Sequence, residues 1–367
     1  MNKNVPILQA VDPTHVDYDG KVYLFFGGYD YHRLSWHPEI MNAMDEASRK
    51  YGINSGGSRC TTGNHPLHLK LERDLAHFFN LEDALLLPTG YLANIALFQG
   101  LRHDFDMVFI DEKCHPCIRN GTAVARMNTM IYPHMDADYI EKEVKKLPAD
   151  KNRFLIVTEG TGSVYSPIVP ADRYAQIAKE YKGMLLVDEA HTAGVLGHTG
   201  RGIREHFKLC SDHYLISGTL SKAFGTYGGY IAGGKRWIEA IRYAAHAYQG
   251  SSAFPLPLCA AGMKAIDIID RSPEKVHTLQ DNSLKVKQYL SEKGFSLPLT
   301  PTPTIPVLFD TPEQTEKLKK NLQEASIYPT YIYYPGGPKE GYFRFALSSA
   351  HSQEDINTFL ECIDRSL

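Results

Sequence analysis

The sequence predicts an α/β fold in which a mainly parallel sheet forms a large domain and a smaller α/β domain follows. Short apolar runs at residues 82–88, 106–111 and 153–158 have the length of buried strands. Amphipathic helical segments such as residues 171–181 separate these runs, and this alternation is typical of parallel sheets covered by helices. The length of 367 residues allows a large domain together with a smaller one.

The charge balance points to small-molecule partners. The chain has 39 Lys and Arg against 42 Asp and Glu, a formal net charge of −3, which predicts no nucleic-acid or membrane surface. No apolar run approaches the length of a membrane span, and Asp12, Asp17 and Asp19 interrupt the region where a signal peptide would be apolar. We therefore expect a cytoplasmic protein that binds neither nucleic acid nor membrane.

Cysteine spacing favours reduced thiols. Of the six cysteines only Cys114 and Cys117 lie close in sequence, and the run Cys-His-Pro-Cys could be a redox pair or half of a zinc site. No second metal-ligand pair with suitable spacing accompanies it, and no thioredoxin-like unit surrounds it. We therefore expect no metal, and cysteines that stay reduced in a cytosolic enzyme.

The stretch from Leu185 to Gly225 carries the chemistry. Asp188 ends an apolar run, His191 follows it, and Lys222 stands among small residues and hydroxyls. A strand-end Asp is usually a turn residue, and a Lys after Ser is usually a solvated charge. Together, however, they match what pyridoxal 5′-phosphate (PLP) needs: a lysine for a Schiff base, an acid for the pyridine nitrogen and hydroxyl donors. The hydroxyls are those of Ser217, Thr219 and Ser221.

A second feature, upstream, suits the phosphate of that cofactor. The strand-like run 82–88 leads at once into Thr89, Gly90 and Tyr91 and then into a predicted helix. Exposed backbone N–H groups and the helix dipole at such a turn both favour an anion. Every α/β protein has several such turns, but this one precedes Asp188 and Lys222, so we predict the phosphate site here.

These segments resemble the α-oxoamine synthases, PLP enzymes of the fold-type-I aminotransferase superfamily that join an amino acid to an acyl thioester with loss of carbon dioxide. The resemblance runs from about Tyr31 to the C-terminus, and its most specific pieces are LLPTGYLANIAL, VDEAHTAGVLGHTGRG, TLSKAFGTYGG and FRFALSSAHSQEDI. It implies an N-terminal segment (1–47), a large PLP-binding domain (48–254) and a small C-terminal domain (255–367).

The resemblance implies a role for each of five residues. Lys222 is the Schiff-base lysine and later a proton shuttle, Asp188 pairs with the pyridine nitrogen, and His191 hydrogen-bonds the phenolic oxygen or the carbonyl side of the ring. His115 stacks on the ring and can contact the substrate carboxylate, although a lone histidine is usually structural. Arg344 binds the substrate carboxylate, although a strand arginine usually faces solvent.

Further cofactor contacts follow from the same resemblance. Ser251 and Ser252 would reach across a homodimer to the neighbour's phosphate, or else form a serine-rich turn before a helix. The remaining predicted cofactor residues are Thr89, Gly90, Tyr91, Ser163, Ser217 and Thr219. In the flanking regions we expect a helix over about 235–248 and small-domain strands near 305–309, 327–332 and 342–347.

Some positions depart from the family pattern. Tyr29 stands where asparagine is common, and Pro116 and Cys117 stand where the family commonly has alanine and serine. The segment SVYSP lacks the acidic residues usual after the third strand-like run, and the N-terminal arm is shorter. These departures leave the details of the cofactor and substrate pocket open.

The predicted function is a decarboxylative condensation of a small amino acid with an acyl-CoA, giving an α-amino ketone. Formation of 8-amino-7-oxononanoate from alanine, as in biotin biosynthesis, is the favoured reaction, with glycine or serine as other donors. Transamination or amino-acid decarboxylation on the same fold is one alternative. A non-catalytic PLP-binding subunit is another, and it is disfavoured because Lys222 is present and no DNA-binding domain accompanies it.

Overall fold

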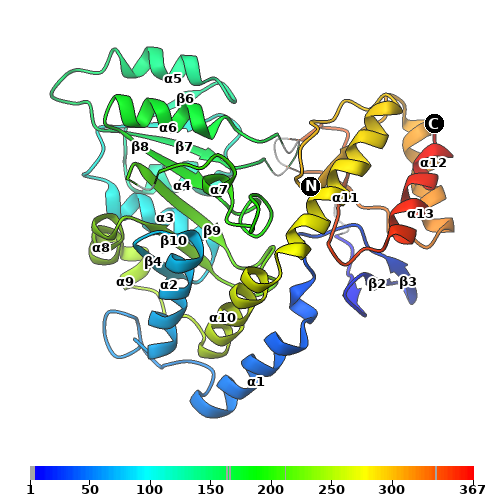
Figure 1. Ribbon diagram of the computed structural model, residues 1–367, viewed down its shortest axis with the longest axis horizontal. Helices are drawn as coiled ribbons and strands as arrows, with labels where there is room; N and C mark the ends of the chain where they lie inside the picture. The colour runs from blue at the N-terminus through cyan, green and yellow to red at the C-terminus, as the bar shows by residue number, and fades with distance from the viewer. Residues whose placement is uncertain (1–4, 163, 165–166, 211, 335–336) are drawn as a thin grey trace.

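A seven-stranded sheet forms the centre of the larger part of the molecule (Figure 1). The computed structural model describes residues 5–162, 164, 167–210, 212–334 and 337–367. The strand order is β4-β10-β9-β8-β7-β5-β6, and only β10 runs antiparallel to its neighbours. The strands are β4 (Asp83–Leu87), β5 (Met107–Asp111), β6 (Thr129–Tyr132), β7 (Phe154–Glu159), β8 (Met184–Asp188), β9 (Tyr214–Thr219) and β10 (Gly229–Gly233). The predicted mainly parallel sheet is confirmed.

Both faces of this sheet are buried because its strands are apolar on both sides. In β8, Leu185 and Val187 pack into one core, whereas Leu186 packs into the other. Helices cover each face (Figure 1). They are α2 (Pro66–Phe79), α3 (Gly90–Leu101), α4 (Pro116–Val124), α5 (Ala137–Val144), α6 (Ala171–Glu180), α7 (Ile203–His206), α8 (Lys235–Ala244) and α9 (His246–Gln249). Full coverage leaves the strand ends as the place where polar side chains gather.

A smaller unit follows, built on an antiparallel sheet of order β11-β13-β12. Helix α10 (Leu256–Arg271) still packs against α1 (Pro38–Tyr51) and α2, and α11 (Pro273–Glu292) carries the chain to the smaller unit. The elements of the smaller unit are β11 (Thr304–Val307), α12 (Pro312–Glu324), β12 (Tyr331–Ile332), β13 (Tyr342–Ala346) and α13 (Gln353–Asp364).

The N-terminal residues belong with the smaller unit in space. Strands β1 (Gln9–Ala10), β2 (His15–Tyr18) and β3 (Lys21–Leu24) form an antiparallel sheet, and η1 (Leu34–Trp36) precedes α1. The N–H of Leu24 donates to the carbonyl of Ser326 at 2.8 Å, and the N–H of Tyr328 donates back to Leu24 at 2.9 Å. Segments at opposite ends of the sequence are therefore joined by backbone hydrogen bonds.

Two predicted elements are shorter than expected. The helix expected over 235–248 breaks at Ala245, which is extended, and α9 then turns Tyr248 into the core. The strand expected over 327–332 keeps an isolated bridge at Ile327 and the pair Tyr331–Ile332. Pro329 lies between them and has no N–H for a sheet hydrogen bond.

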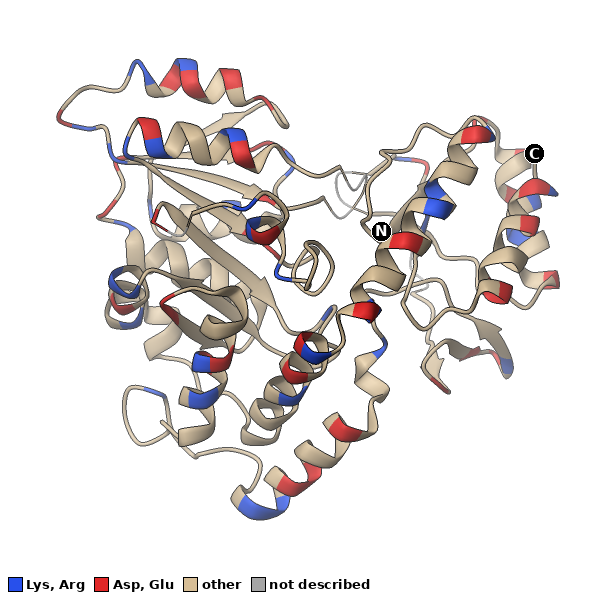
Figure 2. Ribbon diagram, in the orientation of Figure 1, with Lys and Arg blue, Asp and Glu red and all other residues tan. Residues whose placement is uncertain are grey.

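Charges follow the same architecture. Figure 2 shows both signs alternating along outer helices such as α1 and α11, whereas the central strands carry few charges. Among the described residues, no helix combines the length and the apolar character needed to cross a bilayer. Charged residues do occur at the ends of the central strands, and two of them, Glu159 and Asp188, line one cavity.

Candidate active site

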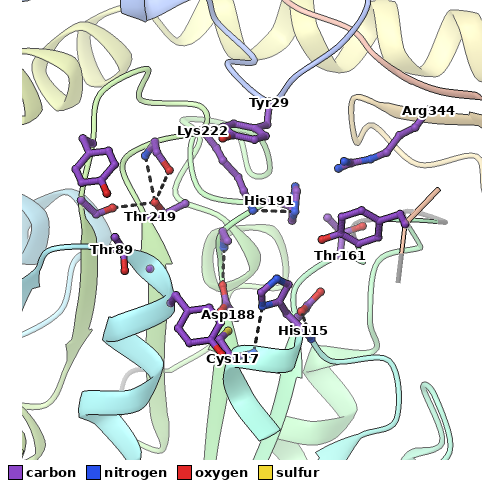
Figure 3. Close-up of a pocket in the computed structure, with 18 residues that line it drawn as sticks. Tyr29, Thr89, His115, Cys117, Thr161, Asp188, His191, Thr219, Lys222 and Arg344 are labelled. Atoms are coloured by element: carbon purple, nitrogen blue, oxygen red, sulfur yellow. Dashed lines mark hydrogen bonds between the residues drawn. The ribbon is translucent and has the colours of Figure 1, made fainter. Parts of the chain in front are cut away.

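A cavity of about 390 Å³ lies at the carboxyl ends of the central strands, where the smaller unit faces them (Figure 3). Ligands bind at this edge in open parallel sheets because loops and helix N-termini converge there. The structure brings nine of the predicted site residues to the wall of this cavity. They are Thr89, Gly90, Tyr91, His115, Asp188, His191, Thr219, Lys222 and Arg344.

Asp188 is held rigidly at the end of β8. One carboxylate oxygen accepts the N–H of Ala190 at 2.9 Å, and the other accepts the side-chain amide of Asn94 at 2.7 Å. The oxygen of the Asn94 amide accepts the hydroxyl of Ser217 at 2.9 Å. Ser217 is fully buried and does not line the cavity, so it acts on the site through Asn94. This network orients the carboxylate toward the cavity without neutralising its charge.

Lys222, His191 and Tyr31 form a chain of hydrogen bonds. The Lys222 amine lies 2.8 Å from Nε2 of His191, and Nδ1 of His191 lies 2.7 Å from the Tyr31 hydroxyl. Burial and the neighbouring Lys222 charge place the pKa of His191 well below its usual value, so the ring is neutral. A neutral imidazole donates from one nitrogen and accepts at the other, so Tyr31 and Lys222 together determine its tautomer.

The Lys222 amine is poised to lose its proton near neutral pH. Burial lowers the pKa of Lys222 to about 8, and the charges of Asp188 and Glu159 oppose that shift. A lysine in water keeps its proton to about pH 10.4. The cavity therefore provides an unprotonated amine, which is the nucleophilic form, at a pH where an exposed lysine would be charged.

Glu159 places a second carboxyl group beside Asp188. It ends β7 and pairs in register with Asp188 on β8, and it accepts the backbone N–H of His115. Burial, followed by the charge of Asp188, raises the pKa of Glu159 to about 8. A second carboxyl group beside Asp188 is costly to ionise, so Glu159 keeps its proton to a higher pH than an exposed glutamate does.

His115 stands at the start of α4, where Nδ1 accepts the N–H of Cys117 at 3.2 Å. Its ring meets that of Tyr91 edge to face, with centroids 6.2 Å apart. Burial lowers the pKa of His115, so the ring that lines the cavity is neutral. This fits a ring that covers a planar ligand.

One end of the cavity is suited to a phosphate. Thr89 caps α3 by accepting the N–H of Leu92, and the following Gly90 opens the helix toward the cavity. A Cβ on Gly90 would lie 3.0 Å from the Cβ of Thr219, so glycine allows the backbone to approach closely. The Thr219 and Ser221 hydroxyls lie 2.7 Å apart at the same end. Helix N–H groups and hydroxyls together form an anion site.

The other end carries an unpaired cation. Arg344 projects from β13, and within the described part of the chain no carboxylate forms an ion pair with it. Its guanidinium carbon lies 5.6 Å from the ring centroid of Tyr334, and its Nε is buried without a hydrogen-bond partner. A guanidinium left open in this way can take a ligand carboxylate in two-point geometry.

Ser251 and Ser252, like Ser217, do not line this cavity. Ser251 donates its hydroxyl to the carbonyl of Ala247, and Ser252 bridges to Ser58, so both lie away from Lys222 within this chain. Their suggested contact with a second subunit stays a prediction. Ser163 lies outside the described residues. Cys114 and Cys117 are unpaired and buried, and the described part of the chain has no cluster of His, Cys, Asp or Glu that could hold a metal.

Sequence reasoning missed Asn94, Tyr31 and Glu159. Asn94 stands one turn after Gly90, so its place on the same face of α3 was available from helical spacing. Glu159 ends its strand as Asp188 does, which was a usable signal for two adjacent carboxyl groups. Tyr31 has no such signal, because its partner His191 is distant in sequence.

The donor set fits PLP. A lysine with a lowered pKa, a fixed carboxylate and a helix N-terminus with neighbouring hydroxyls face one cavity. The fold and this constellation together define a PLP enzyme of fold type I.

Comparison with known proteins supports the assignment to the fold-type-I PLP enzymes. Residues 22–363 match the family model "Aminotransferase class I and II". The chain is 33% identical to a putative 8-amino-7-oxononanoate synthase of Acetivibrio thermocellus, covering 98% of this chain and 92% of that protein. It is 32% identical to a serine palmitoyltransferase of Sphingobacterium spiritivorum, covering 96% and 89%. A solved serine palmitoyltransferase from S. paucimobilis with a bound PLP–myriocin aldimine superposes with TM-score 0.91 at 26% identity, covering 99% and 92%.

The chain therefore belongs to the aminotransferase class I and II family and, within it, to the α-oxoamine synthases. It is an enzyme, and its cofactor is pyridoxal 5′-phosphate.

Proposed function

We propose that this enzyme condenses a small amino acid with an acyl-CoA, releasing carbon dioxide and free coenzyme A and forming an α-amino ketone. The observation that carries the proposal is the meeting of the Lys222 amine, the Asp188 carboxylate and the unpaired Arg344 guanidinium in one cavity. Relatives named 8-amino-7-oxononanoate synthase and serine palmitoyltransferase support this reaction class.

Different residues of the cavity would bind different parts of the cofactor. Asp188 would hold the ring nitrogen, the N-terminus of α3 with Thr219 would hold the phosphate, and Lys222 would bind the aldehyde carbon. PLP, when bound, withdraws electrons from the α-carbon of an amino acid. Asn94 serves this chemistry by keeping the Asp188 carboxylate in one orientation.

Lys222 moves the proton of the reaction. An unprotonated Lys222 amine would take the α-proton of a bound amino acid, because a base with a pKa near the working pH transfers protons efficiently. His191 lies 2.8 Å from that nitrogen and, held by Tyr31, fixes the amine in position.

Arg344 and His115 orient the amino acid. The open guanidinium binds the substrate carboxylate, and the neutral His115 ring covers the face of the site. This arrangement supports condensation with a small amino acid, because carboxylate and amine are held at two fixed points. Alanine, glycine and serine all fit such a two-point grip, and the favoured sequence-based donor is alanine, as in 8-amino-7-oxononanoate formation.

The assembly is part of the same proposal. We propose a cytoplasmic homodimer in which the region of Ser251 and Ser252 contacts the neighbouring subunit. Sedimentation at several protein concentrations tests this, and a monomer that binds PLP fully would contradict it.

The reaction is tested by incubating the PLP-loaded protein with alanine, glycine or serine and a panel of acyl-CoA esters of different chain length. Free thiol and carbon dioxide are both recorded, and the proposal expects them in equal amounts. Lys222→Ala is the control, and it should release neither. Absorbance changes with amino acids and accumulation of a 2-oxo acid, without thiol release, would instead identify an aminotransferase.

A further inference from the structure

The cavity has two chemically different ends on either side of Lys222. Figure 3 places Thr89 and Thr219 toward one end, and Arg344 and Thr161 toward the other. The first end suits a phosphate and the second a carboxylate. An amino acid whose nitrogen lies at Lys222 and whose carboxylate lies at Arg344 must place its side chain among the residues of the second end.

Thr161 presents a buried hydroxyl without a partner at this second end. Its side chain is 3% exposed and lines the cavity, and Oγ1 has no hydrogen-bond partner among the described residues. The residue follows β7 and pairs with Ile168 in an isolated bridge, so its backbone is fixed. Nearly all buried polar side-chain atoms in proteins are paired, so an unpaired hydroxyl that faces a cavity is available to a ligand.

Two neighbouring polar groups already have partners within the protein. Glu159 accepts the N–H of His115, and Nδ1 of His115 accepts the N–H of Cys117. Arg344 is the group proposed for the carboxylate, and the residues suited to a phosphate lie at the opposite end. Thr161 therefore has hydrogen-bonding capacity that neither the cofactor nor the common part of an amino acid uses.

We propose that Thr161 makes this enzyme selective for serine, because its hydroxyl hydrogen-bonds the hydroxyl of the amino-acid side chain. The inference rests on the proposed function and names its amino-acid substrate. Serine can both donate and accept, so it pairs with Thr161 in either rotamer of the hydroxyl. A methyl group in the same place leaves the hydroxyl desolvated and unpaired, which is costly.

Glycine and alanine then differ in a defined way. Glycine leaves space beside Thr161 that a water molecule can fill, since the site is polar and open to the cavity. Alanine covers the hydroxyl and excludes that water. The expected order of affinity is serine, then glycine, then alanine, which differs from the alanine preference favoured by the sequence.

Binding measured without acyl-CoA tests the inference. The PLP-loaded protein is titrated with L-serine, glycine and L-alanine, and absorbance of the cofactor gives the dissociation constants. We expect serine to bind about tenfold more tightly than alanine, the effect of one well-formed hydrogen bond in a closed site. Thr161→Val, which keeps the shape but removes the hydroxyl, should bring this ratio close to one, and Thr161→Ser should preserve it.

Several outcomes would overturn the assignment. A ratio near one in the unaltered protein would do so, even if no variant folds. A ratio that survives Thr161→Val would place the selectivity elsewhere, and a ratio lost equally in Thr161→Ser would make the residue structural. Thiol release is measured separately, so a protein that prefers serine but releases no thiol would contradict the proposed acyl transfer and leave the selectivity intact.

Discussion

Two lysines with lowered pKa values have contrasting surroundings. Lys222 faces a cavity, contacts His191 and lies within the field of Asp188 and Glu159. Lys287, on α11, is fully buried, and its amine donates to backbone and side-chain oxygens of Thr300 and Thr302 at 2.8–3.2 Å. Burial lowers the pKa of Lys222 to about 8 and that of Lys287 to about 7.

A lowered pKa alone therefore does not identify a reactive lysine. Lys287 is enclosed by neutral oxygens that belong to the protein, so its amine ties residues 300–302 to a helix and has no room for a substrate. Among the described residues Lys222 has a hydrogen-bond contact with His191 alone, and it faces open space near the carboxyl groups of Asp188 and Glu159. Space and nearby carboxyl groups separate a catalytic amine from a structural one, and each can be changed by mutation.

Replacing the amine gives the largest expected effect. Lys222→Ala should abolish covalent capture of PLP and lower thiol release by at least about 1000-fold, because the variant lacks both nucleophile and base. Lys287→Met is the matched control and should keep the absorbance of the bound cofactor. The comparison fails if Lys287→Met also loses that absorbance while remaining folded.

Removing the charge beside Lys222 comes next. Asp188→Asn keeps the shape but removes the carboxylate that would pair with the ring nitrogen, so the affinity for PLP should fall about 100-fold. The lost charge should also lower the pKa of Lys222 further, since Asp188 raises it. Equilibrium dialysis measures the affinity, and a change of less than twofold would argue against the assigned role.

The rate of PLP capture should depend on pH through the protonation of the Lys222 amine. The unprotonated amine reacts, so the rate of PLP capture by cofactor-free protein should rise with pH and level off above about pH 8. At pH 7 about one tenth of the maximum rate is expected. Rapid-mixing absorbance gives the profile. A rate still rising at pH 10 would mean that the amine behaves like an exposed lysine.

A smaller effect is expected at Tyr31. Tyr31→Phe removes the hydroxyl that holds Nδ1 of His191, leaving the ring free to change tautomer. Loss of one hydrogen bond corresponds to about 1 kcal/mol, so the rate of PLP capture should fall roughly fivefold. The same rapid-mixing experiment measures it, and an unchanged rate together with an unchanged melting temperature would show that the contact does not matter.

The smallest effect on activity is expected at Lys287, where stability changes instead. Its pKa is lower in the folded protein than in the unfolded chain, so the unfolded chain binds an extra proton between about pH 7 and 10.4. Stability should therefore rise with pH across this window in the unaltered protein.

Lys287→Met should lose this contribution, which is at most about 1.4 kcal/mol per pH unit. Denaturant unfolding at pH 7 and pH 9 tests it, with the exposed Lys285→Met on the same helix as control. Equal pH slopes in the Lys287→Met variant and the unaltered protein would show that Lys287 keeps its proton when buried.

Much of the fold and part of the site followed from local sequence. Asp188, Lys222 and the turn at Gly90 were predictable because each depends on a strand end or a helix start that apolar runs reveal. The hydrogen bond between Ser217 and Asn94 was not predictable, because it depends on how helix α3 packs against strand β9. Arg344 Nε and the Thr161 hydroxyl have no hydrogen-bond partner among the described residues. This depends on the three-dimensional packing around them, which sequence spacing does not show.

The same limit applies outside the cavity. The helix breaks at Ala245 because Tyr248 packs into the core, and no single residue in the sequence indicates this. Strand β12 is short because Pro329 has no N–H to donate, and this cause can be read from the proline itself. The roles assigned to Ser251 and Ser252 depend on a second chain and stay predictions.

The stretch between Leu24 and Tyr31 works as a short tether. Its first residue is hydrogen-bonded to the smaller unit and its last to His191 at the carboxyl edge of the central sheet. Tyr31 also joins the two parts directly, because its carbonyl accepts the N–H of Ser349 in the smaller unit at 3.0 Å while its hydroxyl lies 2.7 Å from Nδ1 of His191. A displacement of the smaller unit would therefore be transmitted through Tyr31 to the imidazole that contacts Lys222. The position of the Lys222 amine therefore depends on how the smaller unit packs against the central sheet.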